Sequence, residues 1–388
     1  LCHNGRGRLD ALSLWGKTAI RMDAERMAAF FARQNITNHP DFNTRDNFFN
    51  GARIVADRIT GEYTLNTTSG NRPPRCAPNA TITRNVCSAT MNLAPEYHVT
   101  GAKPPAGRSW RETFADNMVQ DPMFARNFAN RLWKEMFNLG LVDPVDTMDP
   151  ARLDPNNPPP DGWELQATHP VLLEKLAETL RGNSFSLREL IRLMANSSAY
   201  QLSSRYGEEW SVDYVPLFAR HYPRRLEGEE VHDAIVKATG VMTSYAIQNW
   251  PVPTVTWAMQ MPDPSEPRSN AGNALNFMNA FLRGNRDSQQ RSQAGSILQQ
   301  LNLMNDQFVT NRNKVGASAN LRALANNTSN PSVVEEIFLL FLGRQPSDRE
   351  RTEAVNVLAK AANQAARNTA VEDLAWVLMN KAEFAYSY

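Results

Sequence analysis

The spacing of apolar residues changes near residue 105 of the chain. From Trp110 onward, apolar residues recur every three or four positions, which is the periodicity of a helix with one buried face. Residues 35–107 are instead rich in Asn, Thr, Pro and Gly, and contain only short β-prone stretches. We therefore expect a mainly α-helical protein. A large multi-helix domain over residues 105–388 would follow a small loop-rich segment with minor β content over residues 1–104.

Capping residues predict where several helices begin and end. Asp121 followed by Pro122 is typical of a helix start, because Asp caps the first turn and Pro lacks an amide hydrogen that this turn would leave unpaired. Ser186 and Glu189 have the spacing of a capping box, and Gly240 is typical of a helix end. The helices predicted after the one at Pro122 are 169–180, 186–196, 227–239, 277–283, 292–311, 319–326, 332–342, 348–368 and 371–380.

Long irregular loops separate some of these helices. Residues 143–162 form a loop of Pro, Asp and Asn, which is either a functional loop or a rigid surface connection. Residues 197–224 and 241–275 are also irregular and carry several aromatic residues. Aromatic rings in such loops either stack on sugars or pin the loop to the core. The aromatic residues concerned include Tyr206, Trp210, Tyr214, Trp250 and Trp257.

Charge and length narrow the classes of partner. The 388 residues include 41 Lys and Arg against 40 Asp and Glu, for a formal net charge of +1. A nucleic-acid binder needs an excess of positive charge, so we expect no nucleic-acid partner. No stretch approaches the roughly 20 apolar residues of a membrane-spanning helix, so we expect no transmembrane span in this chain.

The three cysteines indicate the compartment. Cys76 and Cys87 flank a short polar loop, and we interpret them as a disulfide that pins the loop-rich segment; two free thiols are the alternative. Such a bridge would stabilise the fold by about 3 kcal/mol on the loop-entropy model. A disulfide implies an oxidising compartment, so we expect an extracytoplasmic protein in the periplasm, at the cell surface or secreted.

Cys2 and His3 resemble the second half of a Cys-x-x-Cys-His haem-attachment motif. The motif predicts a covalent haem c at Cys2, with His3 as the axial ligand. A disulfide from Cys2 to another cysteine and a motif that carries no haem are the alternatives. Because the chain does not begin with Met, we expect it to be the C-terminal portion of a longer exported protein.

One helix combines the residue types of acid–base chemistry. Glu229 is spaced to share a face of the predicted helix with His232 and with Asp233. Carboxylates beside a histidine can transfer protons, which makes these three the candidate catalytic residues of a hydrolase or lyase. Arg224 and Arg225 precede the same helix, so buried ion pairs are the alternative role.

Several segments that follow one another along the chain carry a family resemblance: Asp121–Trp133, Gly140–Asp146, Ser184–Leu190, Arg224–Ala234, Leu301–Asn305, Leu342–Pro346 and Asp373–Phe384. They resemble one uncharacterised bacterial family, the secreted planctomycete and acidobacterial cytochrome-associated family. Its two domains of unknown function are numbered fifteen forty-nine and fifteen fifty-three. The resemblance to the second domain covers about residues 105–388, and the end of the first is matched only near Cys2 and at Met27–Phe31.

The resemblance implies an exported protein, often encoded beside sulfatase-like exported proteins that are candidate partners. In that family the haem motif is often followed by Asp-His-Lys-Phe-Asp, whereas Asn4 and Gly5 follow His3 here. The missing second histidine disfavours a two-histidine metal site, and no metal site is predicted.

We therefore expect an exported cell-surface or periplasmic binding or scaffold protein of unknown ligand, either associated with polysaccharide or self-assembling as a homo-oligomer. An electron-transfer protein with haem c at Cys2 is the first alternative. A hydrolase or lyase that uses Glu229, His232 and Asp233 is the second.

Overall fold

The computed structural model describes residues 13–17, 19, 21–38, 53–66, 90–247, 254–264, 266–267, 272–284 and 295–387. The chain divides into two compact units, residues 1–221 and residues 222–388, and each is described by itself. The division at 1–104 and 105–388 expected from composition stays a prediction. Cys2, His3, Cys76 and Cys87 lie outside the described residues, and so do the predicted haem and disulfide sites.

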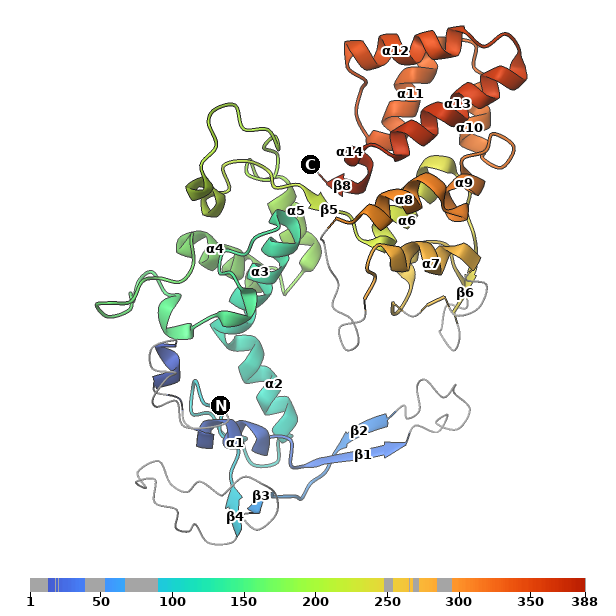
Figure 1. Cartoon of the computed structure of the whole chain (residues 1–388). Coiled ribbons are helices and arrows are strands. Elements are labelled where there is room, and N and C mark those ends of the chain that lie inside the picture. The colour runs from blue at the N-terminus through green and yellow to red at the C-terminus, as the bar shows by residue number, and fades with distance from the viewer. Residues whose placement is uncertain are drawn as a thin grey trace. The chain divides into compact units, whose positions relative to one another are not determined.

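The beginning of the first unit combines short helices with two antiparallel strand pairs (Figure 1). Strand β1 pairs with β2, and β3 pairs with β4. Phe30 is fully buried and packs against Phe114 of the helix α2 (Trp110–Gln120). The elements are η2 (Trp15–Lys17), α1 (Arg21–Ala29), β1 (Gln34–Asn38), β2 (Arg53–Asp57), β3 (Tyr63–Asn66) and β4 (Thr90–Leu93).

The rest of the first unit is helical. Asp121 caps the helix that starts at Pro122, its carboxylate accepting a hydrogen bond from the Met123 amide at 2.9 Å. In the core, Trp133 stacks on Phe137 with ring centroids 3.7 Å apart. The elements are α2 (Trp110–Gln120), α3 (Pro122–Phe137), α4 (Pro170–Gly182), α5 (Leu187–Ala195) and the 3-10 helix η6 (Val212–Leu217).

The loop 143–162 is anchored through a buried carboxylate. It contains the 3-10 helices η4 (Val145–Thr147) and η5 (Pro150–Arg152). Between them, Asp149 is 4% exposed and accepts hydrogen bonds from the amides of Leu14, at 2.6 Å, and Trp15, at 3.1 Å. Asp149 therefore joins this loop to the N-terminal segment at Leu14 and Trp15. This contact fits the role of a rigid surface connection.

The second unit is built around α6 (Gly228–Thr239), which contacts helices on several sides. Apolar residues of α6 such as Val231 and Ile235 are fully buried in one continuous core. The other helices, shown in orange to red in Figure 1, are α7 (Gly272–Ala280), α8 (Ile297–Asn305), α9 (Gln307–Arg312), α10 (Ala319–Asn326), α11 (Asn330–Leu342), α12 (Asp348–Ala359), α13 (Gln364–Met379) and α14 (Ala382–Ala385).

Short strands complete the second unit. Strand β5 (Arg224–Arg225) pairs with β8 (Tyr386–Ser387) near the end of the chain, so the last residues pack beside the start of α6. Strand β6 (Tyr245–Ala246) pairs with β7 (Thr254–Val255), and the 3-10 helix η7 (Ala258–Gln260) follows.

The expected fold class is confirmed: the protein is mainly helical, with a small loop-rich N-terminal part that contains minor strands. Two helix breaks differ from the prediction. The segment 292–311 is interrupted at Asp306, whose side chain caps a new helix, and the break predicted at 369–370 lies at 360–363 because Asn363 caps α13. In the described ranges, no helix is both long enough and apolar enough to cross a membrane.

Candidate functional site

Helix α6 positions the three residues that the sequence singled out. Its start is capped by Glu230, whose carboxylate accepts a hydrogen bond from the Glu227 amide at 2.8 Å. Gly240 ends the helix in the left-handed conformation, with φ of 68°. Between these ends, Glu229 and His232 are buried and Asp233 is partly buried.

His232 and Asp233 form a chain of hydrogen bonds with Tyr245 of β6. The Nδ1 atom of His232 lies 2.8 Å from Asp233 Oδ1, and Nε2 lies 2.8 Å from the Tyr245 hydroxyl. Because a carboxylate only accepts, Nδ1–H donates to Asp233, and the Tyr245 hydroxyl then donates to Nε2. Asp233 also accepts hydrogen bonds from the amides of Ala258 and Met259, so it anchors η7 to α6.

The histidine and the tyrosine of this hydrogen-bonded group are closed to solvent. His232 is 0% exposed and Tyr245 is 1% exposed. Burial lowers the pKa of His232, although the hydrogen bond to Asp233 opposes that shift. Burial likewise raises the pKa of Tyr245. Both groups are therefore neutral at pH 7.

Aromatic and cationic groups surround the histidine. The His232 ring stacks on Phe308 of α9, with centroids 4.7 Å apart, and the Arg312 guanidinium lies 3.8 Å from the centroid of that phenyl ring. Arg312 donates to the carbonyls of Val241 and Phe308 and, at 2.7 Å, to the Thr243 hydroxyl. Burial lowers the pKa of Arg312.

Glu229 belongs to a second buried group. Its carboxylate accepts a hydrogen bond from Arg283 Nε at 2.7 Å, and the two side chains are 6% and 1% exposed. Arg283 also donates to the carbonyls of Asp263 and Glu266, which ties the segment before α7 to the start of α6. The neighbouring pair, Arg224 and Glu230, is bidentate, at 2.7 and 2.8 Å.

The chemistry open to these groups follows from their burial. A histidine between a carboxylate and a hydroxyl has the order of groups found in nucleophilic hydrolases. Here both ring nitrogens are already bonded within the core, and the hydroxyl that would attack a substrate is covered. Among the residues that the structure describes, no three His, Cys, Asp or Glu side chains are grouped so as to hold a metal ion.

An open pocket of about 420 Å³ lies elsewhere in the second unit. Its lining comes from Leu226 just before α6, from the middle of α6, from the end of α11 with the two residues after it, and from the last residues of the chain. The lining residues are Leu226, Ala234, Phe341, Leu342, Gly343, Arg344, Glu383, Phe384, Tyr386 and Ser387.

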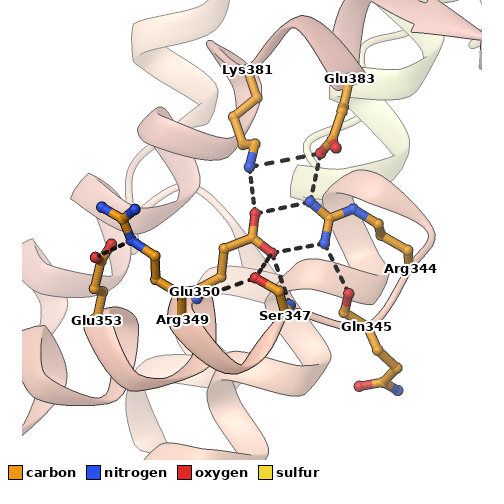
Figure 2. A network of polar contacts seen from close by, with 8 residues as sticks. All are labelled: Arg344, Gln345, Ser347, Arg349, Glu350, Glu353, Lys381 and Glu383. Carbon is orange, nitrogen blue, oxygen red and sulfur yellow. Dashed lines mark hydrogen bonds and ion pairs between the residues drawn. The ribbon is translucent and has the colours of Figure 1, made fainter. Parts of the chain in front are cut away.

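A network of four charges borders this pocket (Figure 2). Arg344 donates to both oxygens of Glu350, at 2.8 and 2.9 Å, and to Glu383 Oε2 at 2.7 Å. Lys381 donates to Glu350 Oε1. The hydrogen bond from Arg344 holds the pKa of Glu350 well below its usual range, with further support from Lys381 and Ser347 and despite burial. The same carboxylate raises the pKa of Arg344.

Sequence reasoning found the residues of α6 but not those of the pocket. Glu229, His232 and Asp233 stood out because they are close in the sequence. Arg344 and Glu383 are 39 residues apart, and their pairing has no signature in a single sequence. One local signal was present, since Ser347 and Glu350 have the spacing of a capping box and do form one at the start of α12.

The aromatic residues of the loop 197–224 pack on one another. Tyr206, Trp210 and Tyr214 make mutual contacts with ring centroids 5.3 to 5.9 Å apart, and the Arg220 guanidinium lies 4.0 Å from the Trp210 centroid. This packing fits a role in pinning the loop. Trp250 lies outside the described residues.

A family model described as a protein of unknown function (DUF1553) matches residues 110–358 of the chain. The match runs from the start of α2 to near the end of α12, and so includes α6 with its buried groups. No curated protein and no solved structure matches the chain.

Proposed function

Because the chain belongs to the DUF1553 family of proteins of unknown function, whose description states no activity, we propose a function from its own residues. The protein is a non-catalytic binding or scaffold protein of the periplasm or the cell surface, associated with polysaccharide. That the family is secreted and cytochrome-associated is also part of this proposal.

The observation that carries the proposal is the complete burial of His232. A general base must lie within hydrogen-bond reach of the proton that it removes from a substrate. His232 is 0% exposed, and its two nitrogens are occupied by Asp233 and Tyr245. His232, Asp233 and Tyr245 therefore form a polar framework that joins α6, β6 and η7. This structural role favours a non-catalytic protein.

The location rests on the resemblance to exported proteins and on the cysteine pattern. Fractionation of native cells is expected to recover the protein in the periplasm or at the surface. Recovery in the cytoplasm alone would contradict the proposed location. The proposed binding role would not be affected, because a separate experiment tests it.

Binding is tested with the purified full chain on an array of neutral and acidic polysaccharides, with each product checked by mass spectrometry. We expect retention of at least one polysaccharide without any chemical change in it. Light scattering on the same samples reports self-assembly, which is the scaffold form of the proposal.

The outcome that contradicts the proposal is turnover that depends on His232. If any compound is converted, and His232→Gln abolishes conversion while the variant stays folded, the protein is an enzyme. His169→Gln is the matched control, because His169 lies at the start of α4 and its side chain shares a hydrogen bond with the neighbouring Thr168 hydroxyl. A chain that neither binds nor assembles also contradicts the proposal.

A further inference from the structure

We propose that the pocket beside Arg344 and Glu383 binds one neutral sugar unit of a polysaccharide. This inference rests on the proposed binding function and names its ligand class and its site. The volume of about 420 Å³ lies within the range of small-molecule sites and is large enough for a single sugar ring.

The apolar part of the lining fits the carbon face of a sugar. Phe341 and Phe384 are 6% and 4% exposed and form part of the wall together with Leu226 and Leu342. The C–H groups of a pyranose ring pack against such surfaces, because neither partner needs to lose a hydrogen bond to water. Gly343 leaves the wall open, since a Cβ atom at that position would meet nothing within 4 Å.

The polar part of the lining has unused hydrogen-bonding capacity. In the part of the chain that the structure describes, Arg344 Nε and Glu383 Oε1 have no hydrogen-bond partner, while the other atoms of both groups are held by the network. The hydroxyls of Tyr386 and Ser387, on β8, are likewise without a partner there. A sugar can use all of these groups, because each of its hydroxyls both donates and accepts.

The charges favour a neutral ligand over an ion. Arg344 and Lys381 lie against Glu350 and Glu383, so the positive and negative charges at this border balance. An anionic ligand would meet the Glu383 carboxylate, and a cationic ligand would meet the Arg344 guanidinium. The ion pairs also fix both side chains before binding, which lowers the entropy lost when a ligand is held.

The experiment is isothermal titration of the full chain with neutral mono- and disaccharides, with glucuronic acid, glucosamine and free amino acids for comparison. Three variants change the pocket. Ala234→Trp fills it from α6, while Tyr386→Phe and Ser387→Ala each remove one hydroxyl and keep the rest of the lining. Tyr206→Phe, which removes a tyrosine hydroxyl from the first unit, is the matched control.

We expect a neutral sugar to bind and Ala234→Trp to weaken it at least about tenfold, because the side chain takes the place of the ligand. Each hydroxyl variant should weaken binding by about 2- to 10-fold, the worth of one hydrogen bond. Tyr206→Phe should bind like the unchanged chain. Circular dichroism checks the fold, and the two hydroxyl variants decide the question if Ala234→Trp does not fold.

Several outcomes overturn the inference while leaving the proposed function standing. Sugar binding that survives all pocket variants, or that Tyr206→Phe removes, places the ligand elsewhere. Binding of charged compounds alone refutes the ligand class, and binding of no compound in the set, by a chain that retains a polysaccharide, refutes the pocket. Chemical conversion of a bound sugar would instead overturn the proposed function itself.

Discussion

His232 shows how burial decides the role of a residue. Its neighbours in the sequence favour acid–base chemistry, yet its hydrogen bonds go to Asp233 beside it and to Tyr245 thirteen residues further on. The histidine stays neutral because burial makes a charged ring costly. A neutral histidine with two hydrogen-bond partners stabilises the fold. Because the ring must stay neutral, the stability of the fold depends on pH.

The pKa of His232 is lowered in the folded chain, so protonation favours the unfolded chain. An unfolded histidine takes up a proton below about pH 6.5. The stability that neutral His232 contributes is therefore fully present above pH 6.5 and decreases as the pH falls below it, by at most about 1.4 kcal/mol per pH unit. Hydrogen exchange of α6 between pH 7 and pH 5 measures this loss.

His232→Gln is the control for this pH dependence. The two proteins differ only at residue 232, so the difference between their pH profiles isolates the contribution of this side chain. We expect the variant to be less stable at pH 7 and the difference to narrow as the pH falls. A difference that stays constant with pH would show that His232 does not titrate as its burial predicts.

At the scale of helices and strands, Gly228 allows α6 to pack closely against α7. A Cβ atom on Gly228 would lie 2.6 Å from the Met278 carbonyl oxygen, which is too close for any real contact. The two helices can therefore approach each other only because residue 228 has no side chain. The obstacle is backbone, so it cannot move aside as the end of a side chain would.

Gly228→Ala is expected to destabilise the second unit by about 1–3 kcal/mol, because the helices must separate. Gly182→Ala is the matched control, since Gly182 is the last residue of α4 and a Cβ atom there meets nothing within 4 Å. Alanine at Gly182 should be neutral or stabilising by about 0.5–1 kcal/mol. Chemical denaturation of each variant measures both effects, and equal effects would refute the close-approach argument.

Helix ends illustrate what a sequence can predict at this scale. The starts at Pro122 and Leu187 and the end at Gly240 lie close to their predicted places, because capping depends on residues within a few positions. The break between α12 and α13 was misplaced, because apolar periodicity continues across it. The position of this break is set by the Asn363 side chain, which caps α13 by accepting a hydrogen bond from the Ala366 amide at 2.9 Å.

At the scale of the whole molecule, the end of the chain closes the second unit. Glu350 of α12 holds both Arg344 before it and Lys381 after α13, and Arg344 also holds Glu383 of α14 (Figure 2). Strand β8 then pairs with β5 beside the start of α6. The network therefore positions the last residues, of which Glu383, Phe384, Tyr386 and Ser387 line the pocket.

Glu350→Gln is expected to loosen this closure, because Arg344 and Lys381 lose the charge that they share. Hydrogen exchange in residues 382–387 and 224–226 should accelerate at least about fivefold, corresponding to 1 kcal/mol or more. Glu353→Gln is the matched control on the same helix. Its ion pair with Arg349 is 65% and 87% exposed, so its removal should change exchange by no more than about twofold. Equal exchange in both variants would show that the network does not hold the C-terminal segment.

The sequence by itself determined the helical class, most helix ends and the group of acidic residues and histidine on α6. These depend on residues that are only a few positions apart in the chain. Only the tertiary structure decided that His232 is enclosed, that Glu229 pairs with Arg283, and that a pocket opens beside Arg344. Such pairings join groups that are far apart in the chain, and packing of the helices determines which polar groups are buried and which stay open to a ligand.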